Sequence, residues 1–360
     1  MNRDDTLVEP RGKRPKTKAR RLFESAPRAH VAKGTTMKAA AIDRFGPPSV
    51  LTIHELPVPE PGPDEVLIAL HAAGVGVWDA DIRRGWWPEG KPKFPLVPGV
   101  DGAGTVTGRG RDVNGLHVGD RVWAYEFINP KGGFYAEYVA VNAEHVDLVP
   151  KRLNLLQAGA AAATGLTALQ AIDVHLRVRA TDTVLIFGAS GAVGSLAVQF
   201  AKRHDAKVIG TARGTEAQAL VKKLGADKVI DPTSDDAIEQ VRKFATGGID
   251  AALALAGGET LQQFLPLVRA GGRVAYPNGV EPEPKAPPKV KLMAYDAEAG
   301  RREFERLAHA VEEARLRVPI AAIHPLEEAA EAHARIERGH VLGRIVLQIR
   351  KDKEIRAASK

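Results

Sequence analysis

The pattern of apolar and polar positions divides the chain into two halves. Between Met37 and Val141, apolar runs of strand length alternate with Gly- and Pro-rich breaks. The runs are MKAAAIDRF, EVLIALHAAGV, GAGTVTGRG, GDRVWAY and GGFYAEYVAV. Short strands with such punctuation are typical of a small, barrel-like β domain.

From about Leu153 the pattern becomes helical and then alternates. LQAGAAAATGLTALQAI predicts a tightly packed helix. Strands are predicted at TVLIFG, KVIGTA and KVID, each followed by a helix at AVGSLAVQFAKRH, TEAQALVKKLG and DAIEQVRKFA. GIDAALALAGG and GGRVAYPNG predict two more strands. Strand–helix alternation with short links specifies a parallel, doubly wound sheet.

The last part of the chain contains a proline-rich loop, Val280–Lys291, then two amphipathic helices and a closing strand, GRIVLQI. We expect this strand to return to the first domain. The predicted fold class is α/β, with a β-rich domain at 37–158 and 302–350. A doubly wound domain occupies 159–301, and an extension occupies 1–36.

Composition narrows the class of protein. A length of 360 residues allows about two domains. The lack of cysteine excludes disulfides, thiolate metal sites and cysteine nucleophiles, and it fits a cytoplasmic protein. The uncharged stretch Asn154–Ile172 is too rich in Ala, Gly, Thr and Gln for a membrane span, so we interpret it as a buried helix.

The net charge of +7 lies mostly at the N-terminus, where residues 1–36 hold ten Lys or Arg and four Asp or Glu. Such a segment is expected to be disordered. It could be an arm for nucleic acid, a targeting peptide, or a solvated extension ahead of a fold that begins at Met37. We favour the solvated extension and expect no nucleic-acid partner.

A glycine-rich turn is the clearest candidate site. Gly188, Gly191 and Gly194 fall between the strand Thr183–Phe187 and the helix after it. Glycines let backbone approach a pyrophosphate, and the helix N-terminus directs free N–H groups at it. The predicted dinucleotide site comprises Gly188, Ala189, Ser190, Gly191, Ala192, Val193 and Gly194.

The end of the next strand indicates which nucleotide is bound. Enzymes that choose NAD place an acid there for the ribose 2′-hydroxyl. This chain has Arg213, nineteen residues after Gly194 and close to Thr211. A guanidinium can hold a 2′-phosphate with two hydrogen bonds. We therefore predict NADPH, with Thr211 and Arg213 in the site; the alternative is that Arg213 is only a solvated residue at a strand end.

The order of these motifs resembles the medium-chain dehydrogenase/reductase superfamily, from Met37 to about Lys351. The resemblance is carried by PLVPGVDGAGTV, VGDRVWAY, GGFYAEYVAV, AAAATGLTALQAI, FGASGAVGSLAVQFAK and HPLEEAAEAHARIERGHVLGRIVL. It implies a GroES-like catalytic domain and a Rossmann domain.

Zinc divides this superfamily. The positions that match its catalytic zinc ligands are Gly76, Val100 and Ala160, and Asp101 matches a nearby Glu. Gly, Val and Ala side chains cannot bind Zn²⁺, so we expect no metal site. The chain resembles the zinc-independent quinone oxidoreductase branch, which reduces quinones, enones and similar conjugated carbonyls with NADPH.

The resemblance also implies roles for single residues. Thr164 matches a threonine that faces the nicotinamide or its ribose, and Ala256 and Asn278 end strands that flank the ring. Arg344 matches a Lys or Arg that reaches the cofactor, or it is an exposed strand charge. Family members commonly form homodimers through the edges of their nucleotide-domain sheets, and we expect the same here.

Candidates for catalysis are Trp78, Asp81 and Tyr125. Trp78, with Trp86 and Trp87, either lines an apolar pocket for a flat substrate or folds a local loop. Asp81 either relays a proton or caps a turn. Tyr125 stands where relatives line the cleft. Asp79 is expected to form structural hydrogen bonds.

Two other functions stay open at this point. The chain could be an NADPH-dependent aldehyde or alcohol reductase, although an isolated carbonyl needs the stronger polarisation that a metal supplies. It could also be a non-catalytic relative that binds NADPH or nucleic acid.

Overall fold

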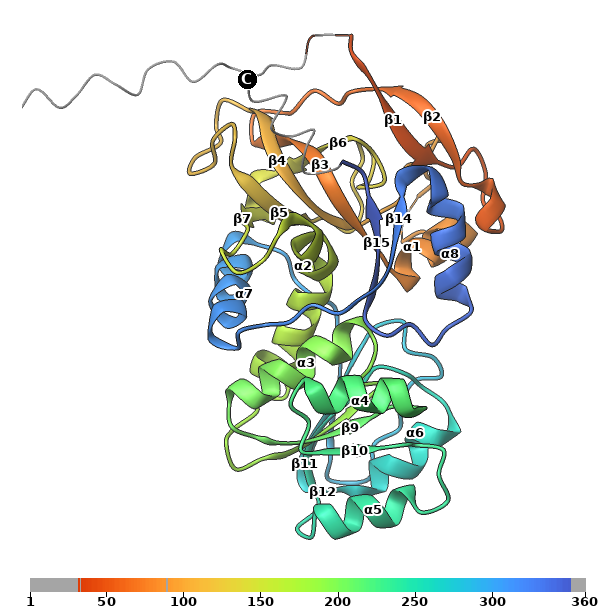
Figure 1. The fold of residues 1–360 in the computed structure, drawn as a ribbon, viewed down its shortest axis with the longest axis vertical. Helices are drawn as coiled ribbons and strands as arrows, with labels where there is room; N and C mark the ends of the chain where they lie inside the picture. Colours follow the sequence, from red (N-terminus) through yellow and green to blue (C-terminus); the bar gives the residue numbers. More distant parts are fainter. Residues whose placement is uncertain (1–31, 33, 89, 351–360) are drawn as a thin grey trace, which may run out of the picture.

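The computed structural model describes residues 32, 34–88 and 90–350, which form two lobes joined by a long helix (Figure 1). The α/β class predicted from the sequence is confirmed. Almost all of the basic extension 1–36 lies outside the described residues.

The β-rich lobe is built on a seven-stranded sheet in the order β14-β15-β3-β4-β5-β7, with β6 paired to β3. A two-stranded sheet, β1 with β2, packs beside it. The elements of this lobe that come from the first half of the chain are β1 (Thr36–Ala41), η1 (Pro48–Val50), β2 (Thr52–Pro57), β3 (Glu65–Val75), α1 (Val77–Arg84), β4 (Asp101–Arg109), β5 (Arg121–Tyr125), β6 (Tyr138–Asn142), η2 (Ala143–His145) and β7 (Val146–Leu148).

The second lobe is a six-stranded parallel sheet in the order β10-β9-β8-β11-β12-β13. The order reverses beside β8, which is where such sheets bind dinucleotides. Its elements are β8 (Thr183–Phe187), α3 (Ala192–Arg203), β9 (Lys207–Thr211), α4 (Thr215–Lys223), β10 (Lys228–Ile230), α5 (Ala237–Phe244), β11 (Ile249–Ala254), α6 (Glu259–Phe264), η4 (Leu265–Leu267), β12 (Val268–Pro277) and β13 (Lys291–Tyr295).

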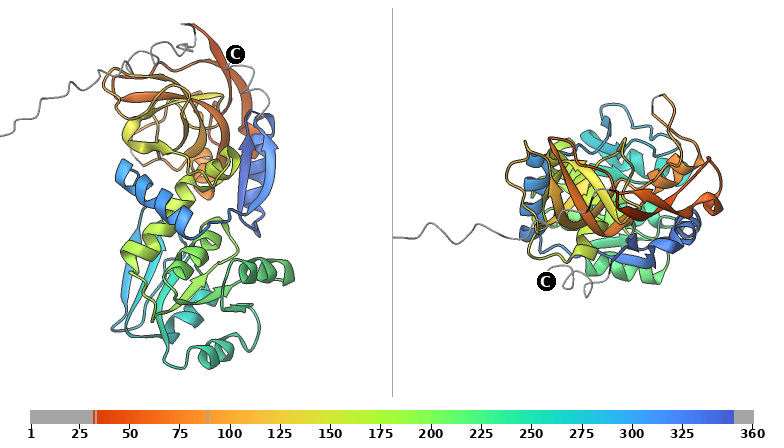
Figure 2. Two further views of the ribbon diagram at one scale, coloured as in Figure 1. Left: turned by 60° about the vertical axis from the view of Figure 1, so that its left-hand side comes forward. Right: turned by 90° about the horizontal axis from the view of Figure 1, so that it is seen from above.

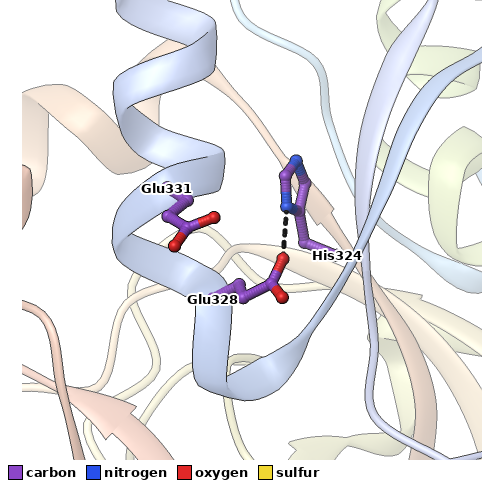
Figure 3. Close-up of side chains that lie close together, drawn as sticks. All are labelled: His324, Glu328 and Glu331. Carbon is purple, nitrogen blue, oxygen red and sulfur yellow. Dashed lines mark hydrogen bonds and ion pairs between the residues drawn. The ribbon is translucent and has the colours of Figure 1, made fainter.

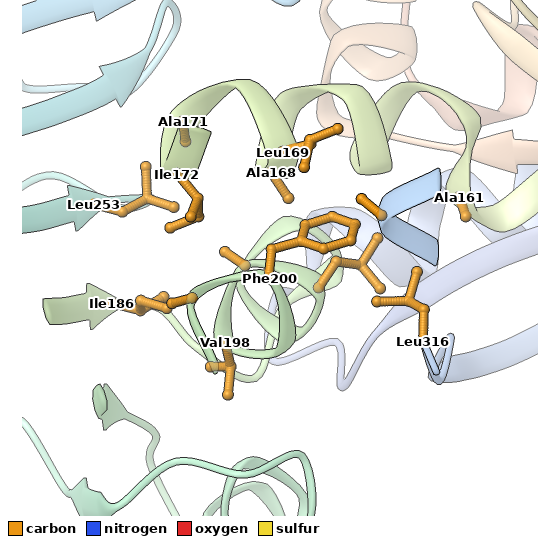
Figure 4. Packing of buried hydrophobic residues seen from close by; sticks show 14 of the residues in the cluster. Ala161, Ala168, Leu169, Ala171, Ile172, Ile186, Val198, Phe200, Leu253 and Leu316 are labelled. Atoms are coloured by element: carbon orange, nitrogen blue, oxygen red, sulfur yellow. The ribbon is translucent and has the colours of Figure 1, made fainter. Parts of the chain in front are cut away.

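Helix α2 (Leu155–Gln170), continued by η3 (Ala171–His175), runs between the lobes. Asn154 caps it by accepting a hydrogen bond from Gln157 N. The helix packs on α3 through small residues around Phe200, as Figure 4 shows. Residues 155–175 are long and apolar enough to cross a membrane, but 83% of the most apolar window is buried inside the fold. This is how the core helix of a globular fold is placed, in agreement with the predicted buried helix.

The C-terminal segment returns to the β-rich lobe, as predicted. It comprises α7 (Arg301–Glu313), β14 (Ile320–Pro325), η5 (Leu326–Glu328), α8 (Ala329–Glu337) and β15 (Arg344–Gln348). Strand β15 pairs antiparallel with β3 and parallel with β14. Figure 2 shows β14, α8 and β15, in blue, against the β-rich lobe. The predicted domain division at 158/159 falls inside α2, which packs against both lobes.

Several elements had no counterpart in the sequence prediction: α1, β2, β7, α6, β13 and β14. They are short, and most carry few buried residues. Strand β13, KLMAY, is mostly exposed and directly follows the proline-rich loop. Helix α1 has eight residues and is stabilised by tertiary contacts of Asp79 and Arg83, which periodicity does not reveal.

Candidate functional site

The glycine-rich turn joins β8 to α3, as the sequence predicted. Gly188 has φ +88°, a left-handed conformation that favours glycine. A Cβ on Gly194 would overlap the carbonyl oxygen of Gly188 and lie 2.8 Å from Ala189 Cα. A Cβ on Gly191 would meet only Gly188 O, at 3.6 Å. Gly191 therefore keeps open space beside the turn, where a ligand can approach the backbone.

Helix α3 begins at Ala192, after its N-cap Gly191, with no acidic residue in its first turn. The first N–H groups of a helix lack intrahelical acceptors and attract anions. Along α3, the first N–H group that donates to a helical acceptor is that of Ser195, which donates to Gly191 O at 2.9 Å. The N–H groups of Ala192 and Val193 precede Ser195, so they remain able to donate to a ligand. The residues present therefore fit a pyrophosphate.

Thr211 and Arg213 end the neighbouring strand β9 in different ways. Thr211 is buried, and its Oγ1 accepts a hydrogen bond from Gly188 N at 2.9 Å, so its hydroxyl holds the turn in shape. Arg213 is exposed. Its Nη2 lies 3.2 Å from His340 Nε2, and its charge lowers the pKa of Asp231. None of the ion pairs among the described residues includes Arg213, so its guanidinium can bind an anion.

The other predicted cofactor residues lie along one edge of the parallel sheet. Ala256 and Asn278 follow β11 and β12, whose carboxyl ends lie at the same edge as that of β8. Asn278 Nδ2 donates to Asp296 Oδ2 at 2.7 Å. Thr164 is buried on α2, and its hydroxyl donates to Ala160 O at 2.9 Å.

Arg344 is buried and paired. Its Nη2 donates to Asp101 Oδ1 at 2.8 Å, and Ala163 N donates to Asp101 Oδ2 at 3.0 Å. Burial raises the pKa of Asp101, and the charge of Arg344 opposes this. The guanidinium lies against Gly76, where a Cβ would stand 3.2 Å from Arg344 Nη1. A cation thus occupies the space beside one of the positions that match zinc ligands in relatives.

Asp79 begins a buried chain of hydrogen bonds. Its Oδ2 accepts from Gly76 N at 2.7 Å and from Tyr135 Oη at 3.1 Å. Burial raises its pKa to about 7, a shift that Arg344 opposes and Asp101 reinforces. Within the described part of the chain, its Oδ1 has no hydrogen-bond partner. The structural hydrogen bonds expected of Asp79 are present.

The chain continues from Tyr135 to His333 and Arg83. His333 Nε2 lies 3.2 Å from Tyr135 Oη, and Arg83 Nε donates to His333 Nδ1 at 3.2 Å. A guanidinium only donates, so Nδ1 must accept and Nε2 must carry the proton of a neutral ring. Burial lowers the pKa of His333 to about 3, in keeping with that state. Arg83 also bonds Glu337 and Gly46 O, and so ties α1 to α8.

Sequence reasoning missed Tyr135, His333 and Arg83. One signal was present, because His333 lies with Ala329, Ala332 and Ile336 at the spacing of the apolar face of α8. A histidine on such a face needs buried partners.

The structure separates the three catalytic candidates. Asp81 is half-exposed and accepts from Arg84 Nη2 at 3.0 Å, away from Asp79. Tyr125 is mostly buried, and burial raises its pKa, with Asp101, Asp296 and Asp79 contributing. Its phenol therefore keeps its proton beside the Asp101–Arg344 pair.

Trp78 belongs to an aromatic group with Trp86 and Phe127, whose ring centroids are 5.3–5.8 Å apart. A Cβ on Gly279, in the loop after β12, would lie 3.1 Å from the Trp78 ring. The indole thus reaches from the β-rich lobe to the other lobe. Trp86 is 43% exposed, so the group has an open side.

One group of described side chains has the spacing of metal ligands: His324, Glu328 and Glu331, with ligand atoms within 4.8 Å of one another. His324 Nδ1 lies 2.9 Å from Glu328 Oε2, at the end of β14 and start of α8 (Figure 3). All three are at least partly exposed and come from the C-terminal segment, apart from the glycine-rich turn. Exposed groups of this kind are common without a metal.

Comparison with known families agrees with this architecture. A model of the alcohol dehydrogenase GroES-like domain matches residues 62–151, within the β-rich lobe. A model of zinc-binding dehydrogenases matches residues 224–347, which span much of the parallel sheet and the closing segment.

Individual proteins match over nearly the whole chain. The quinone oxidoreductase of Mus musculus is 32% identical over 318 residues, covering 84% of this chain and 95% of that protein. The solved structure of an NAD-dependent alcohol dehydrogenase is 31% identical, with a TM-score of 0.81 over 87% of this chain and 100% of that one. A mycobacterial protein solved with NADPH is 28% identical, with a TM-score of 0.77, over the same two shares.

Proposed function

This chain belongs to the medium-chain dehydrogenase/reductase superfamily, with quinone oxidoreductase-like relatives, and on that premise we propose that it transfers a hydride from NADPH to a conjugated carbonyl. The substrate class is a quinone, an enone or a similar compound. The chain is an oxidoreductase by its family; the cofactor, the substrate and the independence from zinc are the proposed parts.

The observation that carries the choice of cofactor is the end of β9. The residue there is Arg213, exposed and without an ion-pair partner among the described residues. An acid at this point would repel a 2′-phosphate, whereas a guanidinium attracts it. The mycobacterial neighbour solved with NADPH is consistent with this choice.

Each part of the edge of the sheet has a role in this proposal. The backbone of Gly191, Ala192 and Val193 would bind the pyrophosphate, and Arg213 the 2′-phosphate. Thr164, Ala256 and Asn278 would border the nicotinamide, whose C4 supplies the hydride when the cofactor is bound.

The β-rich lobe would position the substrate and its proton. Trp78 and Trp86 offer apolar faces for a flat ring system and exclude water. Burial raises the pKa of Tyr125, which keeps its phenol neutral and able to donate a hydrogen bond to the oxygen on which negative charge develops.

The proposed independence from zinc rests on Gly76, Val100 and Ala160, which offer no donor atom. Metal analysis of the purified protein after treatment with a chelator tests it directly. Retention of one Zn²⁺ per chain would contradict this part and favour an alcohol dehydrogenase activity, which the 31% identical dehydrogenase structure makes the natural rival.

The cofactor is tested by titrating NADPH and NADH against tryptophan fluorescence. We expect NADPH to bind more tightly, and Arg213→Asp to weaken NADPH binding about tenfold or more while sparing NADH, because the change places a negative charge at the 2′-phosphate. Arg111→Asp, another exposed arginine, is the control. Equal affinities in the parent would refute the role of Arg213. Turnover of NADPH with quinones, enones and aldehydes then separates the substrate classes.

We also propose a homodimer and a cytoplasmic location. Strand β13 is a free edge of the parallel sheet, with Leu292 37% exposed. An edge of this kind can pair with a second copy.

A further inference from the structure

The loop between α8 and β15, Gly339–Gly343, reaches from the β-rich lobe to the nucleotide lobe at two points. Gly343 N donates to Ser190 O at 2.9 Å and forms a parallel bridge with Gly191. At its other end, the imidazole Nε2 of His340 lies 3.2 Å from Arg213 Nη2. One short loop therefore touches both the glycine-rich turn and the end of β9.

Those two points are neighbours in the sheet. Strands β8 and β9 pair in parallel, with Ile186 opposite Gly210, so their carboxyl ends lie side by side. The adenosine half of a dinucleotide lies over these two ends in a Rossmann domain. The loop thus borders the place where the adenosine ribose would be held.

The positive charge of Arg213 at this place favours an anion. Arg213 and His340 are both exposed and face each other through nitrogen atoms. Among described residues, neither forms an ion pair with a carboxylate. Hydrogen bonds from Thr233 lower the pKa of Asp231, and the charge of Arg213 adds to this. The Asp231 oxygens are, however, already occupied by Thr233 and Gly214 N.

The loop is held in shape. Arg335 donates to Gly339 O at 2.8 Å and to His340 O at 3.1 Å. His340 has φ +50°, which residues other than glycine seldom adopt and which surrounding contacts must maintain. The position of the imidazole is therefore set by the fold of the loop.

We propose that His340 and Arg213 together bind the 2′-phosphate of NADPH, one from each lobe. This inference rests on the proposed choice of NADPH and adds a second ligand for the phosphate. A phosphate monoester has several acceptor oxygens, so it can accept from the guanidinium and the imidazole at once. NADH lacks this group and would lose both contacts.

The test measures binding alone, by calorimetry on the full-length protein. The probes are 2′,5′-ADP, which carries the 2′-phosphate, and 5′-ADP, which does not. We expect His340→Ala to weaken 2′,5′-ADP binding about tenfold, the loss of one charge-assisted hydrogen bond, and to leave 5′-ADP unchanged. His340→Gly removes the same side chain and tolerates φ +50°, so it should give the same result without backbone strain. His117→Ala, at another exposed histidine, is the control.

The outcomes separate this inference from the function beneath it. If Arg213→Ala abolishes the preference for 2′,5′-ADP and both His340 variants keep it, the role of His340 is refuted and the choice of NADPH stands. If the parent protein shows no preference, both are refuted. A loss of 2′,5′-ADP affinity in both His340 variants, with unchanged thermal unfolding, supports joint binding of the 2′-phosphate by His340 and Arg213.

Discussion

At the scale of single residues, the most informative groups are buried charges. Asp79 and Arg344 lie in the β-rich lobe with orphaned polar atoms, Oδ1 and Nε. Asp101 forms an ion pair with Arg344, and burial raises the pKa of Asp101 as it does that of Asp79. Burying such groups costs free energy unless they are fully paired. Their burial without full pairing fits a site whose polar groups await a ligand or a proton.

Asp79 should make stability depend on pH. Its pKa is about 7 in the folded chain against an ordinary value of 3.8, so the folded state keeps a proton that the unfolded state releases. Its contribution is therefore full below about pH 4 and is lost as pH rises through 7. Asp79→Asn removes the buried charge and should raise Tm relative to the parent by a few degrees more at pH 8 than at pH 5, since about 1 kcal/mol corresponds to roughly 2–4 °C.

Differential scanning calorimetry at the two pH values measures this difference. Asp112→Asn, a change at an exposed acid, should leave the pH dependence as it is. If the difference in Tm between Asp79→Asn and the parent were the same at pH 5 and pH 8, the raised pKa of Asp79 would be refuted.

At the scale of elements, the turn between β8 and α3 contains glycines with different physical reasons. Two are needed for the backbone to fold, and a third leaves room for a ligand. Gly188 needs its left-handed backbone, and Gly194 needs the close approach to Gly188 O. Gly191 has ordinary φ, −75°, and space around it. Its lack of a side chain is not required by the fold, which leaves ligand approach as the physical reason for a glycine.

Replacing these glycines should separate the two requirements. Gly191→Ala should keep the Tm of the parent and weaken NADPH binding about tenfold, because the methyl group enters the space beside the pyrophosphate. Gly194→Ala should lower both stability and binding, since its methyl group overlaps backbone; a cost of about 1–3 kcal/mol is expected. Thermal unfolding and fluorescence titration give the two measurements. Unchanged NADPH binding in Gly191→Ala would show that the cofactor does not lie on this turn.

At the scale of the whole molecule, the contacts between the two lobes depend on segments far apart in the sequence. Strand β15 joins β3, while the loop before it contacts Ser190 in the other lobe. Trp78, about 200 positions earlier in the sequence, contacts the loop at Gly279 in the parallel-sheet lobe. The C-terminal segment is therefore part of the core of one lobe and contacts the glycine-rich turn of the other.

A proposed dimer through β13 gives a prediction at this scale. Leu292→Asp places a charge on the exposed edge of the sheet, and a two-fold axis would bring two such charges together. Light scattering after size-exclusion chromatography should show a dimer for the parent and a shift to monomer for the variant. Leu148→Asp, at another exposed leucine on β7, should stay dimeric. A dimeric Leu292→Asp protein would place the interface elsewhere.

Much of this architecture was predictable because its signals are local. The parallel sheet, the turn at Gly188–Gly194, α2, α7, α8 and the strand β15 all follow from apolar periodicity and glycine spacing. Helix α1 and strand β13 were missed because their positions depend on partners distant in the sequence. The bonds of Asp79 to Tyr135 and of Arg83 to His333 and Glu337 span 56, 250 and 254 positions, and no periodicity encodes such pairs.

The sequence by itself determined the class of fold, the place of the glycine-rich turn and the arginine at the end of β9, because each depends on residue type and neighbouring residues alone. Only the tertiary structure decided which side chains meet: Arg344 with Asp101 against Gly76, Trp78 with Gly279, and His340 with Arg213. These contacts join the two lobes or distant strands. They form only when folding brings together segments that are far apart in the sequence, and the local pattern of residues does not encode such contacts.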